Sequence, residues 1–408
     1  MTRPVRDAGG APSLTRLRRL LLALIAPRPM EAAQLARLRD ADWARIAAMA
    51  QDHRLGPLLH HRCAGLAEIP SPLREIWRNA YRASALAAMA MKAGLERVTA
   101  RLEGAGLAPV ALKGAWLAWH GYRDPALRPL RDLDLLLTPD SVLDAHALLE
   151  ADGYRPLAPP EMPLAAQLRF DKHLPELVSP DGIVVELHHR LWEPDGRLDH
   201  AMPQDDAAGF RRRASRCGAI LYPAPEDMLA HLLIHATYGH RLDCGPLVLA
   251  DIAALLDRCP IDWPAFWQRA AGEGWRPGAR LLLAVAEQQG MIALPLPAEA
   301  GPPPPAMVLD AFPDLVLPPL ETRQNAAVIA SGLAGGAAAL RRRTLGRRRA
   351  GGVEEPRDMR AEGGFAGWAG RRLWRLAGQL AKPGLWRQAR ALARFSRWLD
   401  AAADANGA

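Results

Sequence analysis

The stretch from Val110 to Leu137 has the sequence VALKGAWLAWHGYRDPALRPLRDLDLLL, and the rest of the chain is organised around it. Its end, Asp132-Leu133-Asp134 followed by further leucines, predicts a strand whose first residues carry two carboxylates. Because side chains alternate along a strand, Asp132 and Asp134 point to the same face. Two acids held side by side repel each other unless a cation lies between them, so the pair is a candidate site for a divalent metal.

The segments around this stretch predict a small sheet. Residues 109–112 form a short apolar run, which we expect to be a strand that precedes a helical segment. Two further apolar runs, 176–178 and 183–188, flank the turn Ser179-Pro180-Asp181-Gly182, and an Asp-Gly turn between such runs predicts a β-hairpin. A helix is expected from Asp140 or Ser141 to about Ala151. The predicted fold class is therefore α+β, with a small mixed sheet flanked by N-terminal and C-terminal helical regions.

Apolar periodicity divides the chain on either side of this sheet. Before Gly106, leucines and alanines recur at helical spacings with no convincing strand, and after about Asp199 helical spacing returns. The proline-rich segment 295–305 is expected to be a linker or ordered coil. The expected regions are an N-terminal helical region (13–106), an α/β core (107–200), a helical region packed on the core (201–294) and a C-terminal helical, basic region (306–408).

The composition is that of a folded chain with an excess of positive charge. Of the 408 residues, 50% are hydrophobic and 24% are charged, which excludes a disordered chain, and the formal net charge is +8. This excess favours an anionic partner such as nucleotide phosphate, nucleic acid or lipid head groups. Much of it lies in Arg341–Arg343 and Arg347–Arg349, away from the acidic pair, so nucleic acid is an open but not a favoured partner.

Cysteine usage and hydropathy indicate a cytoplasmic protein without a membrane span. The four cysteines are widely spaced and form no Cys-x-x-Cys pair, which is typical of reduced thiols rather than of a disulfide framework or a zinc site. The apolar run 326–340 is shorter than the ~20 residues that a membrane helix needs, so we expect a buried helix there. The amphipathic region 368–399 is expected to pack on the core rather than to lie on a membrane surface.

A third carboxylate completes the predicted site. Glu186 lies in the otherwise apolar run 183–187, where a charge is costly unless it is paired or binds a cation. If this arm of the hairpin lies beside the Asp132 strand, three carboxylates converge, and Mg²⁺ suits such oxygen ligands. Lys113-Gly114 stands at a strand end before a helix, where a glycine lets backbone N–H groups approach a phosphate.

Several motifs stand in a fixed order along this region. They are a strand ending in Leu112-Lys113-Gly114, Arg128 four residues before Asp132-Leu133-Asp134, then Gly153-Tyr154, then Val185-Glu186-Leu187-His188. This order resembles the pattern of the uncharacterised bacterial nucleotidyltransferases, a family of the DNA polymerase beta-like nucleotidyltransferase superfamily. A looser similarity covers roughly residues 40 to 290 and includes Glu226–His235 and Asp251-Ile252.

The resemblance implies a Mg²⁺-dependent nucleotidyltransferase that moves a nucleoside monophosphate from a nucleoside triphosphate to a hydroxyl or phosphate of a small-molecule or protein acceptor. By carry-over, Asp132, Asp134 and Glu186 are catalytic residues that bind two Mg²⁺ ions, and the acceptor oxygen displaces pyrophosphate from the α-phosphorus. The substrate-binding residues expected beside them are Lys113, Gly114, Arg128 and His188.

Simpler interpretations of the same residues remain open. One acid of the pair would cap a turn while the other pairs with Arg128 or Arg131. Glu186 would form a buried salt bridge with Arg190 or Lys172. In that case the carboxylates would stabilise the fold and would bind no metal.

Other functions are also open. The usual Gly-Ser loop of the superfamily appears here as Lys113-Gly114, at a longer spacing from Asp132, and the missing serine favours a catalytically inactive nucleotide-binding regulatory or accessory protein as an alternative. A metal-dependent glycosyltransferase would also use an Asp-x-Asp motif, but the early helical region and the few short strands argue against its long parallel sheet. His231 and His235 have the spacing of a zinc-protease helix but lack the glutamate base, which argues against a metalloprotease.

Overall fold

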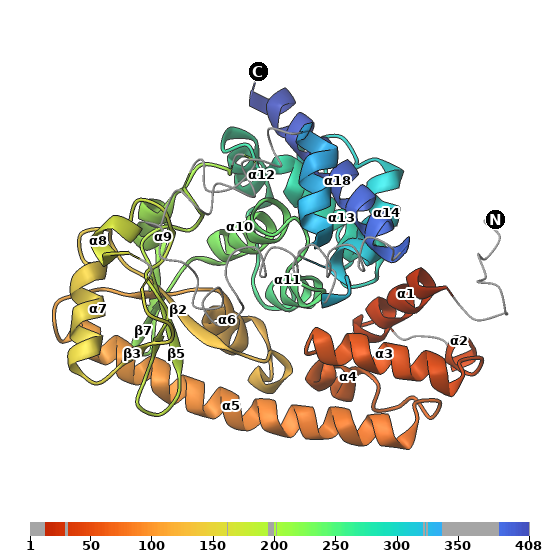
Figure 1. Cartoon of the computed structure of the whole chain (residues 1–408), viewed down its shortest axis with the longest axis horizontal. Coiled ribbons are helices and arrows are strands. Elements are labelled where there is room, and N and C mark those ends of the chain that lie inside the picture. Colours follow the sequence, from red (N-terminus) through yellow and green to blue (C-terminus); the bar gives the residue numbers. More distant parts are fainter. Residues whose placement is uncertain are drawn as a thin grey trace, which may run out of the picture.

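Short strands form one sheet in the order β3-β4-β5-β2-β1-β7-β6, with helices packed around it (Figure 1). The computed structural model describes residues 13–28, 32–160, 162–194, 200, 202–320, 323, 325–336 and 383–407. The combination of a mixed sheet with many flanking helices confirms the α+β fold class that the sequence predicts.

The middle of the sheet consists of the strands that the central stretch predicts. β2 (Asp132–Leu136) lies between β1 (Val110–Ala111) and β5 (Val184–His188). It runs antiparallel to β1 and parallel to β5. The apolar residues of β2 and β5 alternate with the acids and are buried: Leu133, Leu135, Val185 and Leu187. This alternation sends the acidic side chains of both strands to the opposite face.

The predicted hairpin is present between β4 (Leu177–Val178) and β5, which pair antiparallel. The backbone N–H of Ser179 donates a hydrogen bond of 2.8 Å to the carbonyl oxygen of Ile183 and closes the turn. Gly182 in this turn has a φ of +87°, a conformation that glycine adopts without steric cost. β3 (Arg155–Pro156) pairs antiparallel with β4 and forms the edge of the sheet.

The other edge is a hairpin that the sequence analysis missed. β6 (Ser215–Cys217) and β7 (Ile220–Tyr222) lie inside the region 201–294, which we expected to be helical throughout. Each strand has only 3 residues, too few to show an alternating pattern, and all of β6 is exposed. β7 is held in the sheet by its parallel pairing with β1, a tertiary contact that spacing along the chain does not predict.

The region before the sheet is helical, as predicted. Its longest helix runs under the sheet in Figure 1 and approaches the start of β5, where a Cβ added at Gly94 would lie 2.3 Å from Ile183 Cδ1. A larger side chain at this position would therefore require the tip of Ile183 to shift. The helices here are α1 (Leu14–Ile25), α2 (Ala32–Leu35), α3 (Asp40–Asp52), α4 (Gly56–Arg62) and α5 (Ser71–Glu103).

Helices also lie between the strands and after them. Within the core these are α6 (Lys113–Trp116), the π-helix η1 (Leu117–Gly121), the 3-10 helix η2 (Pro125–Leu127), α7 (Val142–Ala151) and α8 (Leu164–Gln167). After it come α9 (Ala207–Arg213), α10 (Pro225–Ile234), the π-helix η3 (His235–Gly239), α11 (Leu247–Arg258), α12 (Trp263–Gly272), α13 (Arg276–Gln288), the 3-10 helix η4 (Ala298–Ala300), α14 (Ala306–Val316) and α18 (Pro383–Gly407).

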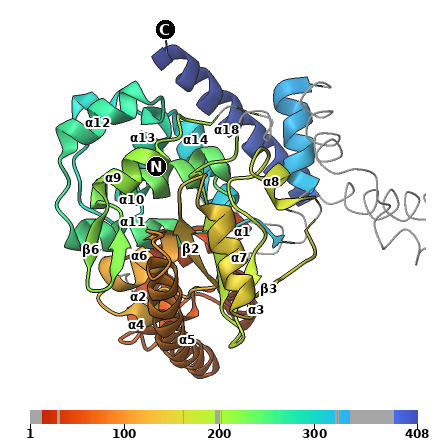
Figure 2. The ribbon, with the colours of Figure 1, turned by 90° about the vertical axis from the view of Figure 1, so that its left-hand side faces the viewer.

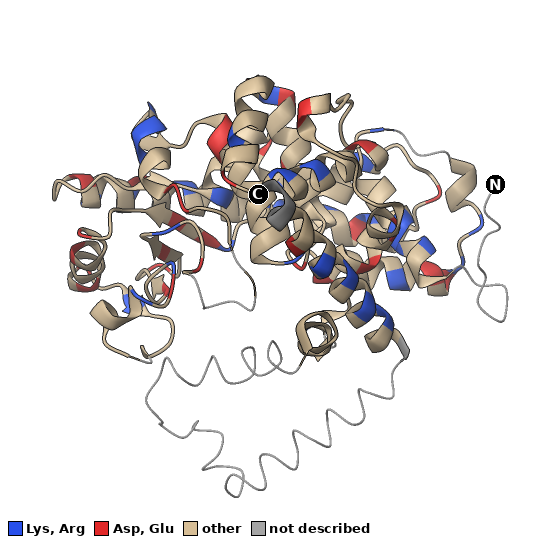
Figure 3. Ribbon diagram, turned by 90° about the horizontal axis from the view of Figure 1, so that it is seen from above, with Lys and Arg blue, Asp and Glu red and all other residues tan. Residues whose placement is uncertain are grey.

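The last helix, α18, packs beside α14 and α13 (Figure 2). It buries one apolar face, including Phe395 and Leu399, which agrees with the packing expected for this amphipathic region. The opposite face carries the exposed residues Arg387, Arg390, Arg394 and Arg397, seen as a blue row in Figure 3. The part of the amphipathic region before residue 383 and the arginine runs at 341–349 lie outside the described residues.

In the described part of the chain, no helix combines the length and the apolar character needed to cross a membrane. The predicted helix at 326–340 is described as far as residue 336, and its described residues are helical. Ala326 packs with Leu385 and Ala389 of α18, so its burial is against protein. The helix is therefore confirmed for residues 326–336, but the expected burial holds only for its first part, since Leu333 is 43% exposed.

A buried ion pair joins the core to α11. Asp251 Oδ1 accepts a hydrogen bond from the Arg128 Nε–H and another from the Tyr122 hydroxyl, each at 2.9 Å. The Asp251 side chain is only 4% exposed. By contrast, Asp257 on the same helix pairs with Arg123, also at 2.9 Å, but is 57% exposed. The two pairs connect the same elements and differ mainly in burial.

We predict that Asp251→Asn lowers the free energy of unfolding by about 3 kcal/mol, because it leaves the buried Arg128 without a counter-charge. Asp257→Asn is the matched control and should cost about 1 kcal/mol or less, since water already screens that pair. Urea unfolding followed by circular dichroism measures both. Equal losses in the two variants would contradict a special role for the buried pair.

Candidate functional site

The predicted site residues line one pocket of about 380 Å³ between the sheet, α10–η3 and the loop that follows α3. Lys113, Gly114, Arg128, Asp132, Asp134 and Glu186 are all among its lining residues. His188 lies directly behind the acids and contacts two of them. The structure therefore brings together residues that are up to 75 positions apart in sequence.

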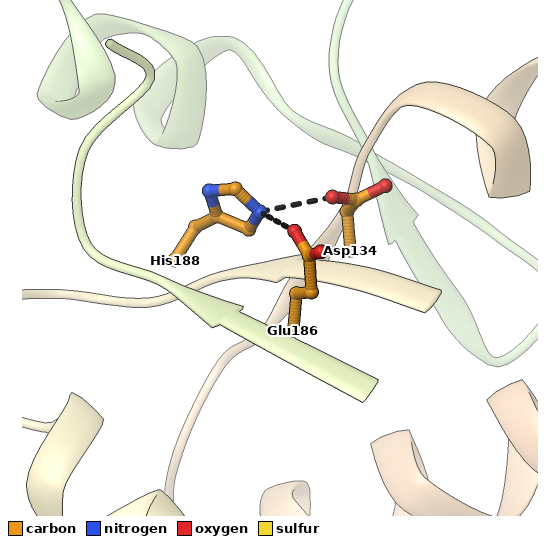
Figure 4. Close-up of side chains that lie close together, drawn as sticks. All are labelled: Asp134, Glu186 and His188. Carbon is orange, nitrogen blue, oxygen red and sulfur yellow. Dashed lines mark hydrogen bonds and ion pairs between the residues drawn. The ribbon is translucent and has the colours of Figure 1, made fainter. Parts of the chain in front are cut away.

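Strand register places the acids. In the parallel pair β2–β5, Asp134 stands opposite Glu186, and Leu136 stands opposite His188. Paired residues of neighbouring strands point to the same face, so Asp132, Asp134, Glu186 and His188 share it. His188 Nε2 lies 2.9 Å from Asp134 Oδ1 and 3.0 Å from Glu186 Oε2 (Figure 4). We call Asp134, Glu186 and His188 the Asp-Glu-His cluster.

Two of the three predicted carboxylates, those of Asp134 and Glu186, cluster with a histidine. Among the described residues, the group whose ligand atoms lie within 4.8 Å of one another is the Asp-Glu-His cluster, and Asp132 lies outside this group. Asp132 is two residues before Asp134 on the same face, a separation of roughly 6–7 Å along a strand. It lines the same pocket beside the cluster.

Lys113 stands between the carboxylates. Its Nζ pairs with Asp134, lies 3.5 Å from His188 Nε2 and lies 3.9 Å from Glu186 Oε2. The residue has a φ of +44°, in the left-handed region that is uncommon outside glycine. This strained turn at the end of β1 directs the ammonium group into the acidic site.

Electrostatics keep two acids of the site ionised. Burial opposes the charge of Asp134, but Lys113 and His188 outweigh it and hold the pKa of this carboxyl well below its usual range. Burial likewise opposes the charge of Glu186, whereas the hydrogen bond from His188 and the charge of Lys113 lower its pKa. One ammonium group thus faces two buried carboxylates.

Asp132, unlike the other two acids, has a raised pKa. Burial, followed by the negative charges of Asp134 and Glu186, raises the pKa of Asp132 to about 6. At this position burial and the two neighbouring carboxylates therefore outweigh the attraction of Lys113 and Arg128. The donor set therefore fits a divalent cation, which would relieve this repulsion.

Two other predicted residues have structural partners as well as pocket positions. Arg128 donates from Nε to Asp251 and from one terminal nitrogen to the Pro129 carbonyl oxygen, so the N–H groups of its other terminal nitrogen remain for a ligand. A Cβ added at Gly114 would lie 2.7 Å from Leu130 Cδ2, so the close approach of this leucine requires glycine or a shift of the leucine tip. Glu186 does not form the salt bridge to Lys172 that we considered, because Lys172 pairs with Glu193 at 3.7 Å.

Histidines line the pocket in addition to the predicted site residues, and His240 is one that the sequence did not single out. His231, His235 and His240 all line the pocket. The rings of His231 and His235 stack with centroids 5.7 Å apart, and His240 meets His235 edge-on at 4.3 Å. Both ring nitrogens of His231 are buried without a hydrogen-bond partner. The helical spacing of His231 and His235 places both on one face of a helix, which could have indicated a shared pocket. In the sequence this spacing was interpreted only as a possible zinc-protease motif.

These histidines are kept neutral by burial. Burial, and then the charges of Lys172 and Lys113, lower the pKa of His240 to about 3. Burial also lowers the pKa of His231 and of His235 well below the ordinary range. The wall opposite the acids therefore presents uncharged aromatic rings at neutral pH.

We predict that acid destabilises the fold partly through His240. The unfolded chain binds a proton near the ordinary pKa of about 6.5, whereas the folded chain excludes it until about pH 3, so stability falls as the pH drops below about 6.5. Between pH 7 and pH 5 this contribution is at most about 2 kcal/mol, because each pH unit below about 6.5 costs about 1.4 kcal/mol. His240→Gln should lose correspondingly less stability over this interval in urea unfolding. An equal loss of stability with falling pH in both proteins would contradict a neutral His240. The difference in the free energy of unfolding between the two proteins at pH 8, where the histidine is neutral in both states, measures the effect of the substitution on packing alone.

Comparison with known proteins identifies one family. The model of a family described as an uncharacterised nucleotidyltransferase matches residues 39–289, which include the whole sheet and every residue that lines the pocket except Arg323. A search of curated proteins finds no match to this chain.

Proposed function

The chain belongs to the uncharacterised nucleotidyltransferase family, and on this premise we propose that it transfers a nucleoside monophosphate from a nucleoside triphosphate to a hydroxyl or phosphate of a small-molecule or protein acceptor. The observation that carries the proposal is the position of Asp134 opposite Glu186 on parallel strands, with Asp132 lining the same pocket. A cytoplasmic location, which the sequence predicts, agrees with a nucleoside triphosphate as substrate.

Mg²⁺ is the proposed cofactor, and Asp132, Asp134 and Glu186 are its proposed ligands. Their carboxylate oxygens are the donors that Mg²⁺ prefers. When bound, the ion would neutralise phosphate charge and lower the pKa of an acceptor hydroxyl. His188 is a proposed positioning residue, because its Nε2 contacts both Asp134 and Glu186 and fixes their orientation.

The cations of the pocket are the proposed phosphate contacts. Lys113 would turn from Asp134 toward the triphosphate once another cation neutralises the carboxylates, and Arg128 would contribute its remaining N–H groups. The acceptor oxygen would form a bond to the α-phosphorus while the bond from this phosphorus to the bridging oxygen breaks and releases pyrophosphate. Glu186 is the proposed carboxylate that receives the proton of a hydroxyl acceptor.

We predict that Asp134→Asn and Glu186→Gln each reduce nucleotide transfer by at least ~100-fold, because each removes a charge that holds the cation. The assay supplies labelled ATP, CTP, GTP and UTP with Mg²⁺ and candidate acceptors, and measures pyrophosphate release. Isothermal calorimetry with each nucleotide and Mg²⁺ measures binding independently of the acceptor.

Asp144→Asn on α7 is a control of the same chemical type, since Asp144 is exposed and lies outside the pocket. It should leave transfer and binding unchanged. Failure of every nucleotide to bind in the millimolar range would contradict the proposed function.

A catalytically inactive nucleotide-binding protein is the second candidate. The observation that favours it is the pairing of Lys113 with Asp134, which already neutralises one proposed metal ligand without any added cation. In this case nucleotide would bind without pyrophosphate release. Binding would also be the same in the presence of EDTA and in Asp134→Asn, whereas the transferase requires both the ion and the carboxylate.

A further inference from the structure

Arg54 comes from the N-terminal helices and reaches the pocket that contains Asp132. It follows α3 in a tight turn, in which the Leu55 N–H donates to the Ala50 carbonyl oxygen over 2.8 Å. Arg54 itself has a φ of +54°, a left-handed conformation that is uncommon for residues other than glycine, asparagine or aspartate. This turn holds the guanidinium beside a strand that lies almost eighty positions later in the sequence.

Arg54 forms no salt bridge in the described part of the chain, although Asp132 and Asp251 attract its charge. Its Nε is buried and makes no hydrogen bond. Arg131, which precedes the Asp132 strand and lines the same pocket, has no ion pair among the described residues either. The other pocket cations are paired, as Lys113 with Asp134, Arg128 with Asp251, Lys172 with Glu193 and Arg323 with Asp243.

The surroundings make this lack of a partner costly. Burial, followed by the positive charges of Arg131 and Arg128, lowers the pKa of Arg54 to about 10, because these effects outweigh the attraction of Asp132 and Asp251. A buried N–H without an acceptor and two neighbouring like charges are both relieved by one anion that offers several oxygens. Phosphate suits such a place, because the planar guanidinium fork binds phosphate oxygens in pairs.

We propose that Arg54 and Arg131 form an anion subsite that binds a phosphate group of the substrate at the Asp132 end of the pocket. The identity of the phosphate-bearing molecule rests on the proposed function. The presence of the subsite does not depend on it. Both the triphosphate of the nucleotide and a phosphate on the acceptor have this chemistry. In either case the N-terminal helices contribute directly to substrate binding.

The test uses the full chain, inorganic pyrophosphate and EDTA, so that no metal ion takes part. Isothermal calorimetry at constant ionic strength should show pyrophosphate binding to the unmodified protein, and at least ~10-fold weaker binding to Arg54→Gln and to Arg131→Gln. Arg131 is exposed, so its variant remains informative if Arg54→Gln is poorly folded. Arg45→Gln, an exposed position on α3, removes the same charge outside the pocket and should bind as the unmodified protein does.

Two further measurements separate the sources of the phosphate and the nature of the site. If the nucleotide supplies the phosphate, Arg131→Gln weakens the binding of nucleoside triphosphate in EDTA as strongly as that of pyrophosphate. If the acceptor supplies it, pyrophosphate binding alone is weakened. Either result supports the subsite.

Unchanged pyrophosphate affinity in both pocket variants, or an equal effect of Arg45→Gln, overturns the inference. So does acetate that competes with pyrophosphate at equal concentration, because a general carboxylate site would then explain the binding. The subsite and the proposed function are tested separately. If Asp134→Asn loses transfer while Arg131→Gln binds pyrophosphate normally, the transferase is supported and the subsite is rejected. If the pocket arginine variants bind pyrophosphate weakly but the unmodified protein transfers no nucleotide, the subsite is supported and the transferase is rejected.

Discussion

The parallel pairing of β2 with β5 is the constraint on which the site depends. It sets Asp134 opposite Glu186 and brings His188 within hydrogen-bond distance of both. Because side chains alternate along a strand, a slip of one residue would turn Glu186 to the leucine face and separate the carboxylates. The buried apolar residues of the two strands fix this register, so the packing of one face of the sheet determines the chemistry of the other.

The pocket contains unbalanced charge of both signs. At one end the carboxylates of Asp134 and Glu186 face one ammonium group, and the pKa of Asp132 rises to about 6. Beside Asp132, Arg54 and Arg131 form no salt bridge among the described residues. A metal-bound phosphate compound supplies both missing charges, which is the chemistry of the proposed substrate.

The helical regions on either side of the sheet have a larger part in the site than their composition suggests. Asp251 of α11 holds Arg128 from inside the core, and Arg54 enters from the turn after α3. The neutral histidines of α10 and η3 close the pocket opposite the acids. The family match across residues 39–289 includes these helices together with the sheet, which agrees with a site built by all three regions.

The sequence by itself determined the fold class, the hairpin around Gly182 and the acidic residues, because alternation along strands and an Asp-Gly turn are local properties. It could not determine that His188 joins Asp134 and Glu186 while Asp132 lies beside them, since this depends on the register between two strands fifty residues apart. It also missed β6 and β7, which are too short to have a pattern and exist through pairing with β1. No pattern in the sequence distinguishes Arg54 from other arginines, and only the tertiary structure places its charge beside Asp132. The path of the chain through the intervening helices is set by packing rather than by local spacing.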